Sequence, residues 1–317
     1  MDAFGPPEVL VLREVADPVC GPGDVLIGVS FSSVTFVETQ VRRGRAPRVS
    51  MLPRLPAVPG NGVAGEVVAA GQAVGGGAIG ARVVSTTGGS GGYAELVSVP
   101  ADGVIPIPRQ VAPADAAALL ADGRTAVGLV DRAAIEPGAT VLVEAAAGGV
   151  GSLFHQLAKR AGAFVVAAAG GERKLDVARS LGADVAVDYG RGSWTAEVAA
   201  AVHGARVDVV FDGVGGSIGR EAFGLLGPGG RLFTFGMASG RFATVSEQEL
   251  TSRGVTQLRG ALANPGDMRE LTARALATAA AGALHPVIGQ AVPLARAGDA
   301  HRAIESRATI GKTLLVP

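Results

Sequence analysis

The sequence predicts an α/β protein that combines a mostly β domain with a doubly wound parallel sheet. From about Glu8 to Pro108, short β-like runs such as VLIGVSF and ARVVST are separated by glycine and proline, which favours an antiparallel, partly closed β domain. After Pro113, strands alternate with helices, and this alternation implies right-handed crossovers and a parallel sheet. A chain of 317 residues exceeds the usual size of one hydrophobic core, so two domains are expected.

The second region has the order of strands and helices that is typical of a Rossmann-type unit. The predicted strands are Thr140–Glu144, Phe164–Ala169, Ala186–Asp188, Val207–Phe211 and Arg231–Phe235, and the predicted helices are Gly149–Ala161, Glu172–Leu181, Trp194–Val202 and Ser217–Leu226. A further helix is expected from about Pro265 to Ala281, after which the strand-like tail returns to the β domain. The predicted domains are therefore 1–112 with 264–317, and 113–263.

Composition excludes several classes of function. Hydrophobic residues make up 48% of the chain and charged residues 18%, which argues against disorder. The formal net charge is zero and the basic residues are scattered, so no nucleic-acid partner is expected. Cys20 is the only cysteine, so no intrachain disulfide can form. The N-terminus lacks the pattern of a secretion signal, and no long apolar run predicts a membrane span. We expect a cytoplasmic protein.

The segment TVLVEAAAGGVG, Thr140–Gly151, is the most informative motif. A strand leads through small residues into the helix-like SLFHQLAKRAG, and this order places a helix N-terminus and bare backbone where a dinucleotide pyrophosphate binds. The pattern is A-x-G-x-x-G, because Ala146 stands where the first glycine is usual. A strand-to-helix turn without a ligand is the alternative.

Taken together, several pieces resemble the quinone oxidoreductase (zeta-crystallin-like) branch of the medium-chain dehydrogenase/reductase superfamily. The pieces are FGPPEVL, SSVTFVETQVRRG, VPGNGVAGEVVAAG, GGYAEL, AAAGGVG, FDGVGG and HRAIESRATIGKTLLVP, in that order along nearly the whole chain. The resemblance implies a GroES-like catalytic domain built from both chain ends, a Rossmann cofactor domain and a homodimer. It also implies that a strand usual before FGPPEVL is missing or shortened here.

The cofactor that the sequence favours is NADPH. NAD-specific Rossmann domains place an acid at the end of the second strand, where it binds the ribose hydroxyls. Here that strand ends in AAAGG, with no acid until Glu172, and the cations Arg173 and Lys174 come next. The resemblance implies that Lys174 and Tyr189 flank the 2′-phosphate. Arg173 and Lys174 are alternatively ordinary cations of an exposed helix turn.

Further cofactor contacts are predicted by position. The glycine turn and the second strand end contribute Ala147, Gly148, Gly149, Val150, Gly151 and Gly170. The resemblance adds Thr125, Gly215, Phe235, Gly236, Met237 and Leu262 near the nicotinamide and its ribose. For Leu262, plain packing is an equal alternative.

No zinc site is expected. The zinc alcohol dehydrogenases share this architecture, but their sites need clustered cysteines and a Cys, His and acid set. Cys20 stands alone and the four histidines lack metal-ligand spacing. Without a metal to polarise an alcohol, hydride delivery to a quinone or a conjugated enone is the expected chemistry.

The candidate catalytic residues are Thr35, Gln40 and Arg124. In the resembled family, asparagine and tyrosine commonly stand where this chain has Thr35 and Gln40. Thr35 can donate a hydrogen bond to a carbonyl oxygen, although a half-buried strand residue is the more ordinary interpretation. Glu38 matches a family acid, with an exposed or paired surface carboxylate as the alternative. Arg124 would favour an acidic substrate, unless it is simply solvated.

Two aromatic residues are predicted to be structural. Tyr93 is expected to pack within a strand of the β domain, and Trp194 is expected to anchor a surface helix to the sheet.

The expected function is an NADPH-dependent, zinc-independent reductase of quinones or enones, with a small-molecule substrate and no membrane partner. A pathway-specific enoyl reductase and an NADPH-binding sensor with little turnover remain as alternatives.

Overall fold

The computed structural model describes residues 1–204, 206–260 and 265–317, and the chain forms two compact units. Unit 1 contains Met1–Arg124 and Arg269–Pro317, and unit 2 contains Thr125–Met268. The α/β class predicted from the sequence is confirmed, because one sheet is largely antiparallel and the other is entirely parallel. Among the described residues, no helix combines the length and the apolar character needed to cross a membrane.

Unit 1 is built on a seven-stranded sheet in the order β12-β13-β1-β2-β3-β5, with β4 paired to β1. Its strands are β1 (Asp24–Val34), β2 (Gly62–Ala70), β3 (Arg82–Thr86), β4 (Leu96–Pro100), β5 (Ile105–Pro106), β12 (Ile288–Pro293) and β13 (Lys312–Val316). Its helices are α1 (Phe36–Arg42), α2 (Pro113–Leu119) and α10 (Ala297–Glu305). Short 3₁₀ turns occur at Pro7–Val9, Val49–Met51, Gly76–Ala78, Ala101–Gly103 and Leu294–Arg296.

Both ends of the chain contribute to the sheet of unit 1. Val34 of β1 is paired with Thr313 of β13 in antiparallel register, and β12 runs parallel to β13. The apolar residues of β1 alternate inward and form one core with those of β2, β3 and β4. Helix α2 packs against β1, β2 and β13, so it belongs to unit 1 although the sequence places it just after the β domain.

Unit 2 contains a six-stranded parallel sheet in the order β11-β10-β9-β6-β7-β8. Its strands are β6 (Thr140–Glu144), β7 (Phe164–Ala169), β8 (Val185–Asp188), β9 (Val207–Asp212), β10 (Leu226–Thr234) and β11 (Thr256–Arg259). Its helices are α4 (Gly149–Arg160), α5 (Glu172–Ser180), α6 (Trp194–Ala201), α7 (Gly216–Leu225) and α8 (Glu247–Arg253). Helices α3 (Asp122–Ala133) and α9 (Pro265–Ala280) contain the boundaries between the units.

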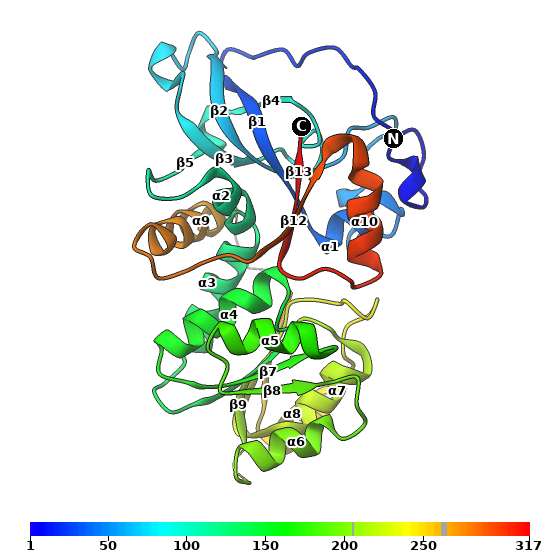
Figure 1. Ribbon diagram of the computed structural model, residues 1–317, viewed down its shortest axis with the longest axis vertical. Coiled ribbons are helices and arrows are strands. Elements are labelled where there is room, and N and C mark those ends of the chain that lie inside the picture. Colours follow the sequence, from blue (N-terminus) through cyan, green and yellow to red (C-terminus); the bar gives the residue numbers. More distant parts are fainter. Residues whose placement is uncertain (205, 261–264) are drawn as a thin grey trace. The chain divides into compact units, whose positions relative to one another are not determined.

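The parallel sheet is covered on both faces, with α4 and α5 on one face and α6 and α7 on the other (Figure 1). Every residue of β6 is buried, which explains its unbroken apolar run TVLV, since a strand covered on both faces shows no alternation. The rings of Phe154 on α4 and Phe211 on β9 stack with centroids 4.0 Å apart. The chain order of the strands changes direction between β6 and β9, which makes their carboxyl ends the topological switch point.

The elements predicted for unit 2 match their observed counterparts closely, except at the start of β10. Strand β10 begins at Leu226, five residues before the predicted start at Arg231, because Leu226 already pairs with Val207 of β9, ahead of a register shift that ends at Arg231. Strand β11 and helix α8 were absent from the prediction.

The two aromatic residues have structural roles, but Tyr93 lies outside any strand. It precedes β4 by three residues, is 7% exposed, and its hydroxyl lies 2.9 Å from Nε2 of His301 on α10. Trp194 begins α6 and belongs to the core that includes Leu142 and Val210 of the sheet, as predicted. Its indole also donates a 2.5 Å hydrogen bond to Glu221 on α7.

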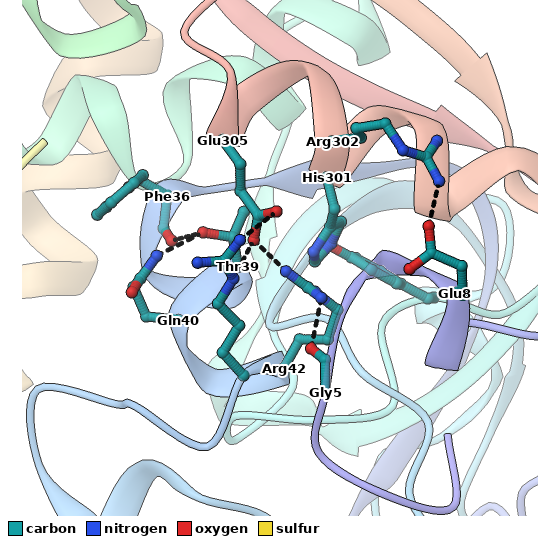
Figure 2. Close-up of polar contacts among 11 residues, drawn as sticks. Gly5, Glu8, Phe36, Thr39, Gln40, Arg42, His301, Arg302 and Glu305 are labelled. Carbon is teal, nitrogen blue, oxygen red and sulfur yellow. Dashed lines mark hydrogen bonds and ion pairs between the residues drawn. The ribbon is translucent and has the colours of Figure 1, made fainter. Parts of the chain in front are cut away.

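A buried ion pair ties α1 to α10 and to the N-terminal segment. Arg42 is fully buried, pairs with Glu305 and donates a 2.5 Å hydrogen bond to the carbonyl of Gly5. Figure 2 shows this network beside the exposed pair between Glu8 and Arg302. A buried guanidinium costs solvation free energy unless its partners remain in place. Arg42 and Glu305 therefore hold α1 in position.

We predict that Glu305→Gln lowers the free energy of unfolding by about 3–5 kcal/mol, because it leaves the buried charge of Arg42 without its anion. Arg302→Gln, which lies on the same helix and breaks the exposed ion pair with Glu8, is the matched control and should change the free energy of unfolding far less. Urea denaturation measures both. Equal losses for the two variants would show that Arg42 does not depend on Glu305.

Candidate functional site

The turn between β6 and α4 has the geometry of a dinucleotide-binding turn. Ala145 takes the left-handed conformation with φ 48°, which is uncommon for a residue with a side chain. The amide of Gly148 then donates a 2.8 Å hydrogen bond to the carbonyl of Ala145. A Cβ atom on Gly151 would lie 2.3 Å from that same carbonyl oxygen, so only glycine lets α4 approach the turn.

The N-terminus of α4 lies directly after this turn. Gly148 is the N-cap residue, and no side chain of the described residues caps it. Gly148, Gly149 and Val150 are partly exposed, whereas Ala147 and Gly151 are buried. The first amide groups of a helix attract anions when no side chain occupies them. The partly exposed backbone of Gly148, Gly149 and Val150 therefore lies at the uncapped start of α4, with Ala147 and Gly151 buried on either side of it.

The end of β7 brings a second group of predicted residues together. Strand β7 runs into Gly170 and Gly171, and α5 begins at Glu172. A Cβ atom on Gly170 would lie 3.4 Å from the ring of Tyr189, so Gly170 and Tyr189 are neighbours. Arg173 is exposed and Lys174 is half-buried in the first turn of α5.

The acid in that turn has a local partner. Glu172 forms a 2.5 Å ion pair with Arg179 two turns further along α5, and Asp176 pairs with the same arginine. The hydrogen bond that Arg179 donates to Glu172 raises the pKa of Arg179 above its ordinary value. The carboxylate of Glu172 is thus directed along the helix by Arg179.

The loops after β9 and β10 are in direct contact. The carbonyl of Asp212 accepts hydrogen bonds from the amides of Phe235, at 3.1 Å, and Gly236, at 3.2 Å. A Cβ atom on Gly236 would lie 2.5 Å from the carbonyl oxygen of Gly213, and one on Gly215 would lie 2.2 Å from that of Arg241. The predicted residues Gly215, Phe235, Gly236 and Met237 therefore lie in two loops packed on each other.

Two acidic residues at this edge of the sheet were missed by the sequence analysis. Glu144 ends β6, Asp212 ends β9, and both are fully buried. Burial is the main cause that raises the pKa of Glu144 well above its usual range, and the neighbouring Asp212 raises it further. The available signal was an acid at the end of two otherwise apolar strands.

Two further residues were predicted to contact the cofactor, Thr125 and Leu262. Thr125 is half-buried on α3 and is the first residue of unit 2. Leu262 lies outside the described residues.

Thr35 and Glu38 form a capping box at the start of α1. The amide and the hydroxyl of Thr35 both donate to Oε2 of Glu38, at 2.5 and 3.0 Å, and the amide of Asn61 donates to Oε1 at 2.8 Å. Glu38 is therefore buried rather than an exposed surface carboxylate, and this burial raises its pKa. It joins α1 to the turn that precedes β2.

Gln40 and Arg124, the other two catalytic candidates, also belong to unit 1. The amide of Gln40 donates a 3.0 Å hydrogen bond to the hydroxyl of Thr39 (Figure 2). Arg124 is half-buried on α3, two residues after Asp122, whose carboxylate pairs with the buried Lys312 at 3.1 Å.

The part of the chain that the structure describes contains no group of three or more histidine, cysteine, aspartate or glutamate side chains that could hold a metal ion. His155 and His301 are buried, and burial lowers their pKa values to about 4 and about 3. His155 lies 3.0 Å from the carbonyl of Ala146, so it supports the glycine turn from α4.

Two family models match the chain. Residues 21–109 match the alcohol dehydrogenase GroES-like domain, and residues 149–277 match the zinc-binding dehydrogenase model. The quinone oxidoreductase of Pseudomonas aeruginosa is 30% identical over 99% of this chain and 98% of its own length. A 2-haloacrylate reductase from a Burkholderia species is 30% identical over 99% of this chain and 96% of its own length.

Solved structures agree with the sequence relatives. An Escherichia coli quinone oxidoreductase complexed with NADPH superposes with a TM-score of 0.90 at 28% identity, over 100% of this chain and 98% of that one. An NAD-dependent alcohol dehydrogenase superposes with the same TM-score at 32% identity, over 100% of this chain and 98% of that one. The chain therefore belongs to the quinone oxidoreductase branch of the medium-chain dehydrogenase/reductase superfamily.

Proposed function

We propose that this protein is an NADPH-dependent reductase that transfers a hydride to a quinone or a conjugated enone or enal without a metal ion. The observation that carries the proposal is the turn Ala145–Gly151, where Gly151 gives α4 its close approach and no side chain of the described residues caps the helix. The names of the Pseudomonas and Burkholderia relatives support a small-molecule acceptor.

The cofactor's pyrophosphate would bind to the backbone of Ala147–Gly151. The amide groups at the start of α4 point along the helix axis, and the helix dipole adds favourable potential for a negative group. Any side chain at Gly151 would push the turn away from the helix. Residues Gly215 and Phe235–Met237 would border the nicotinamide half of the cofactor.

The preference for NADPH over NADH rests on the end of β7. No carboxylate stands at Ala169, Gly170 or Gly171 to accept hydrogen bonds from the ribose, and Arg173 and Lys174 follow in the first turn of α5. Because Arg179 engages Glu172, the acid in that turn is partly neutralised. The NADPH complex of the Escherichia coli relative supports this choice, whereas the NAD-dependent neighbour favours NADH.

When bound, the reduced nicotinamide supplies the hydride, and the acceptor needs no further activation if it is already electrophilic. We propose that the Thr35 hydroxyl changes its partner from Glu38 to the carbonyl oxygen of the substrate. Glu38 would still accept the amides of Thr35 and Asn61, so α1 keeps its N-terminal cap. Gln40 is the second candidate contact for the substrate.

A second candidate function is the reduction of a particular α,β-unsaturated acid or enoyl intermediate. It is favoured by Thr35 and Gln40, which replace the asparagine and tyrosine common in the family, and by the relative named 2-haloacrylate reductase. Arg124 is the cation that we propose for an acidic acceptor. We further propose that the protein works in the cytoplasm, in keeping with its single cysteine. We also propose that it forms a homodimer, as the family resemblance implies.

The first test is the oxidation of NADPH, followed at 340 nm, with an ortho-quinone, a simple enal and an enoyl thioester, each repeated with NADH. We expect turnover of the quinone or the enal with NADPH preferred. Turnover of the thioester alone would select the enoyl reductase, and tight binding of NADPH without turnover would select a sensor.

We predict that Lys174→Glu raises the dissociation constant for NADPH by roughly tenfold to a hundredfold and changes that for NADH far less. The reason is that a charge-assisted hydrogen bond contributes about 1.5–3 kcal/mol, and the substitution removes it only from the cofactor with a 2′-phosphate. Fluorescence titration of both cofactors measures the effect.

Arg160→Glu, at the exposed far end of α4, makes the same change of net charge and should alter neither constant by more than about twofold. An unchanged ratio of the NADPH and NADH constants in Lys174→Glu would remove Lys174 from the phosphate site.

We predict that Gly149→Asp weakens the binding of NADPH and NADH equally, because its carboxylate would face the pyrophosphate. The same carboxylate lies in the first turn of α4, where the helix dipole stabilises an anion by about 0.3–1 kcal/mol. The thermal midpoint should therefore be unchanged or higher while affinity falls. A fall in both cofactor affinity and thermal stability would indicate a damaged turn instead.

A further inference from the structure

Glu144 and Asp212 form a buried pair of carboxyl groups at the topological switch point of the parallel sheet. They are the last residues of the neighbouring strands β6 and β9, and neither is exposed. The residues before them, Val143 and Phe211, are paired in register, and one amide, that of Val214, lies within 3.3 Å of a carboxyl oxygen of each, so the two carboxyl groups are close neighbours. Two carboxylates cannot both remain ionised at such a separation in a buried site without strong repulsion.

Backbone amides converge on this pair. The amide of Val214 donates to Oε2 of Glu144 at 3.3 Å and to Oδ1 of Asp212 at 3.1 Å, and the amide of Gly215 donates to Oδ1 at 2.6 Å. Oε1 of Glu144 and Oδ2 of Asp212 are buried and have no donor among the described residues. One proton held between the carboxyl groups would supply a hydrogen bond that the protein otherwise lacks.

The charged and titratable neighbours do not relieve this repulsion. Glu221 on α7 adds a further negative charge that raises the pKa of Glu144. His155 on α4 faces the turn after β6, and burial lowers its pKa to about 4, so it is uncharged near neutral pH. Helix α7 approaches Asp212 so closely that a Cβ atom on Gly219 would lie 2.6 Å from Oδ2.

The pair connects three of the loops that the proposed function assigns to the cofactor. Glu144 immediately precedes the glycine turn that begins at Ala145. The carboxylate of Asp212 holds Val214 and Gly215, and its main-chain carbonyl accepts the amides of Phe235 and Gly236. A movement of either carboxyl group would therefore move loops after β6, β9 and β10 together.

We propose that Glu144 and Asp212 share one proton and act together as positioning residues, holding the glycine turn, the Gly215 loop and the Phe235–Gly236 loop in the arrangement that binds the nicotinamide cofactor. The assignment to a cofactor rests on the proposed function, whereas the sharing of a proton does not.

A shared proton makes stability depend on pH with a defined sign. Burial raises the pKa of Glu144 in the folded protein above its value in the unfolded chain. Its contribution to stability is therefore complete below the unfolded pKa and is lost as the pH rises toward the folded one. Between these two pKa values, unfolding releases one proton, so the unfolding equilibrium constant rises tenfold per pH unit.

The first experiment compares wild type with Glu144→Gln by urea denaturation from pH 5.5 to 7.5. The glutamine amide can donate to Asp212 and its oxygen can accept from Val214, but it does not titrate. We expect the ratio of the wild-type to the variant unfolding constant to rise about tenfold per pH unit, which is about 1.4 kcal/mol. His155 and His301 are present in both proteins and cancel from the ratio.

A constant ratio over this pH range would overturn the shared proton. Asp208→Asn is the matched control, because Asp208 also lies on β9 and accepts the amide of Thr140 on β6, at 2.7 Å, but is exposed at the opposite end of the strands. It should give a flat ratio to wild type. In the wild type alone, infrared spectroscopy at pH 7.5 should show a buried protonated carboxyl group, and its absence would also overturn the proposal.

The second experiment measures NADPH affinity at pH 7.5 in Glu144→Gln and Glu144→Ala. We expect the dissociation constant to stay within about twofold of wild type for the glutamine variant and to rise about tenfold or more for the alanine variant, which cannot hold Val214 or Asp212. Equal affinity in all three proteins would overturn the positioning role. If NADPH affinity falls equally in both variants, a neutral amide does not replace the Glu144 carboxyl group, and the proposal that Glu144 acts in its protonated form is overturned.

Failure of the proposed function gives a different result. If the wild type binds neither NADPH nor NADH, the cofactor assignment falls together with the positioning role. The proton shared by Glu144 and Asp212 is still tested by the denaturation series and the infrared spectrum, neither of which contains a cofactor.

Discussion

The close approach of backbone segments at the carboxyl edge of the parallel sheet is the constraint on which the rest of unit 2 depends. The turn after β6 meets α4 at Gly151, and the loop after β9 meets the loop after β10 where Gly213 and Gly236 lie. At each contact, a Cβ atom would fall within 2.5 Å of a carbonyl oxygen. Backbone therefore faces backbone at this edge, and its amide and carbonyl groups are available to organise one another and a ligand.

Unit 1 uses a different solution to position its polar residues. Glu38 is buried and accepts amides from Thr35 and Asn61, while Arg42 at the other end of α1 pairs with Glu305. A helix of seven residues is too short to be stable alone. These two carboxylates fix both of its ends, so the Thr35 hydroxyl and the Gln40 amide are carried on a helix with a defined place in its unit.

Much of the fold follows from the sequence because local signals agree with the burial of each strand. The runs TVLV and FVVAAA are apolar throughout since helices cover both faces of β6 and β7, and this made the parallel sheet recognisable. The start of strand β10 was mislocated because LGPGG has the composition of a turn, yet Leu226 already pairs with Val207 of β9 before the register shifts and pairing resumes at Arg231. Propensity describes single segments, whereas pairing depends on the neighbouring strand.

The candidate site could be predicted from the sequence only where local residues determine the backbone conformation. Glycines with fixed spacing identified the turn before α4, and the missing acid after β7 could be read directly from AAAGG. The pairing of Glu144 with Asp212 could not be predicted, since 68 positions separate them and their contact exists only once β6 and β9 are adjacent. Likewise, the burial of Glu38 depends on Asn61 in a distant turn, so the sequence left open whether Glu38 is a family acid or a surface carboxylate.

The pairing of β1 with β13 also determines the order in which the molecule can be completed. Unit 2 is one continuous stretch of chain, Thr125–Met268, whereas unit 1 needs strands from both ends. During synthesis, β1, β2 and β4 emerge before unit 2 and β13 emerges after it, so only the Ser32–Val34 part of β1 waits for its partner while unit 2 can already fold. An exposed strand edge is a template for pairing with other chains. The Ser32–Val34 segment of β1 is therefore open to pairing with another chain until β13 has been synthesised.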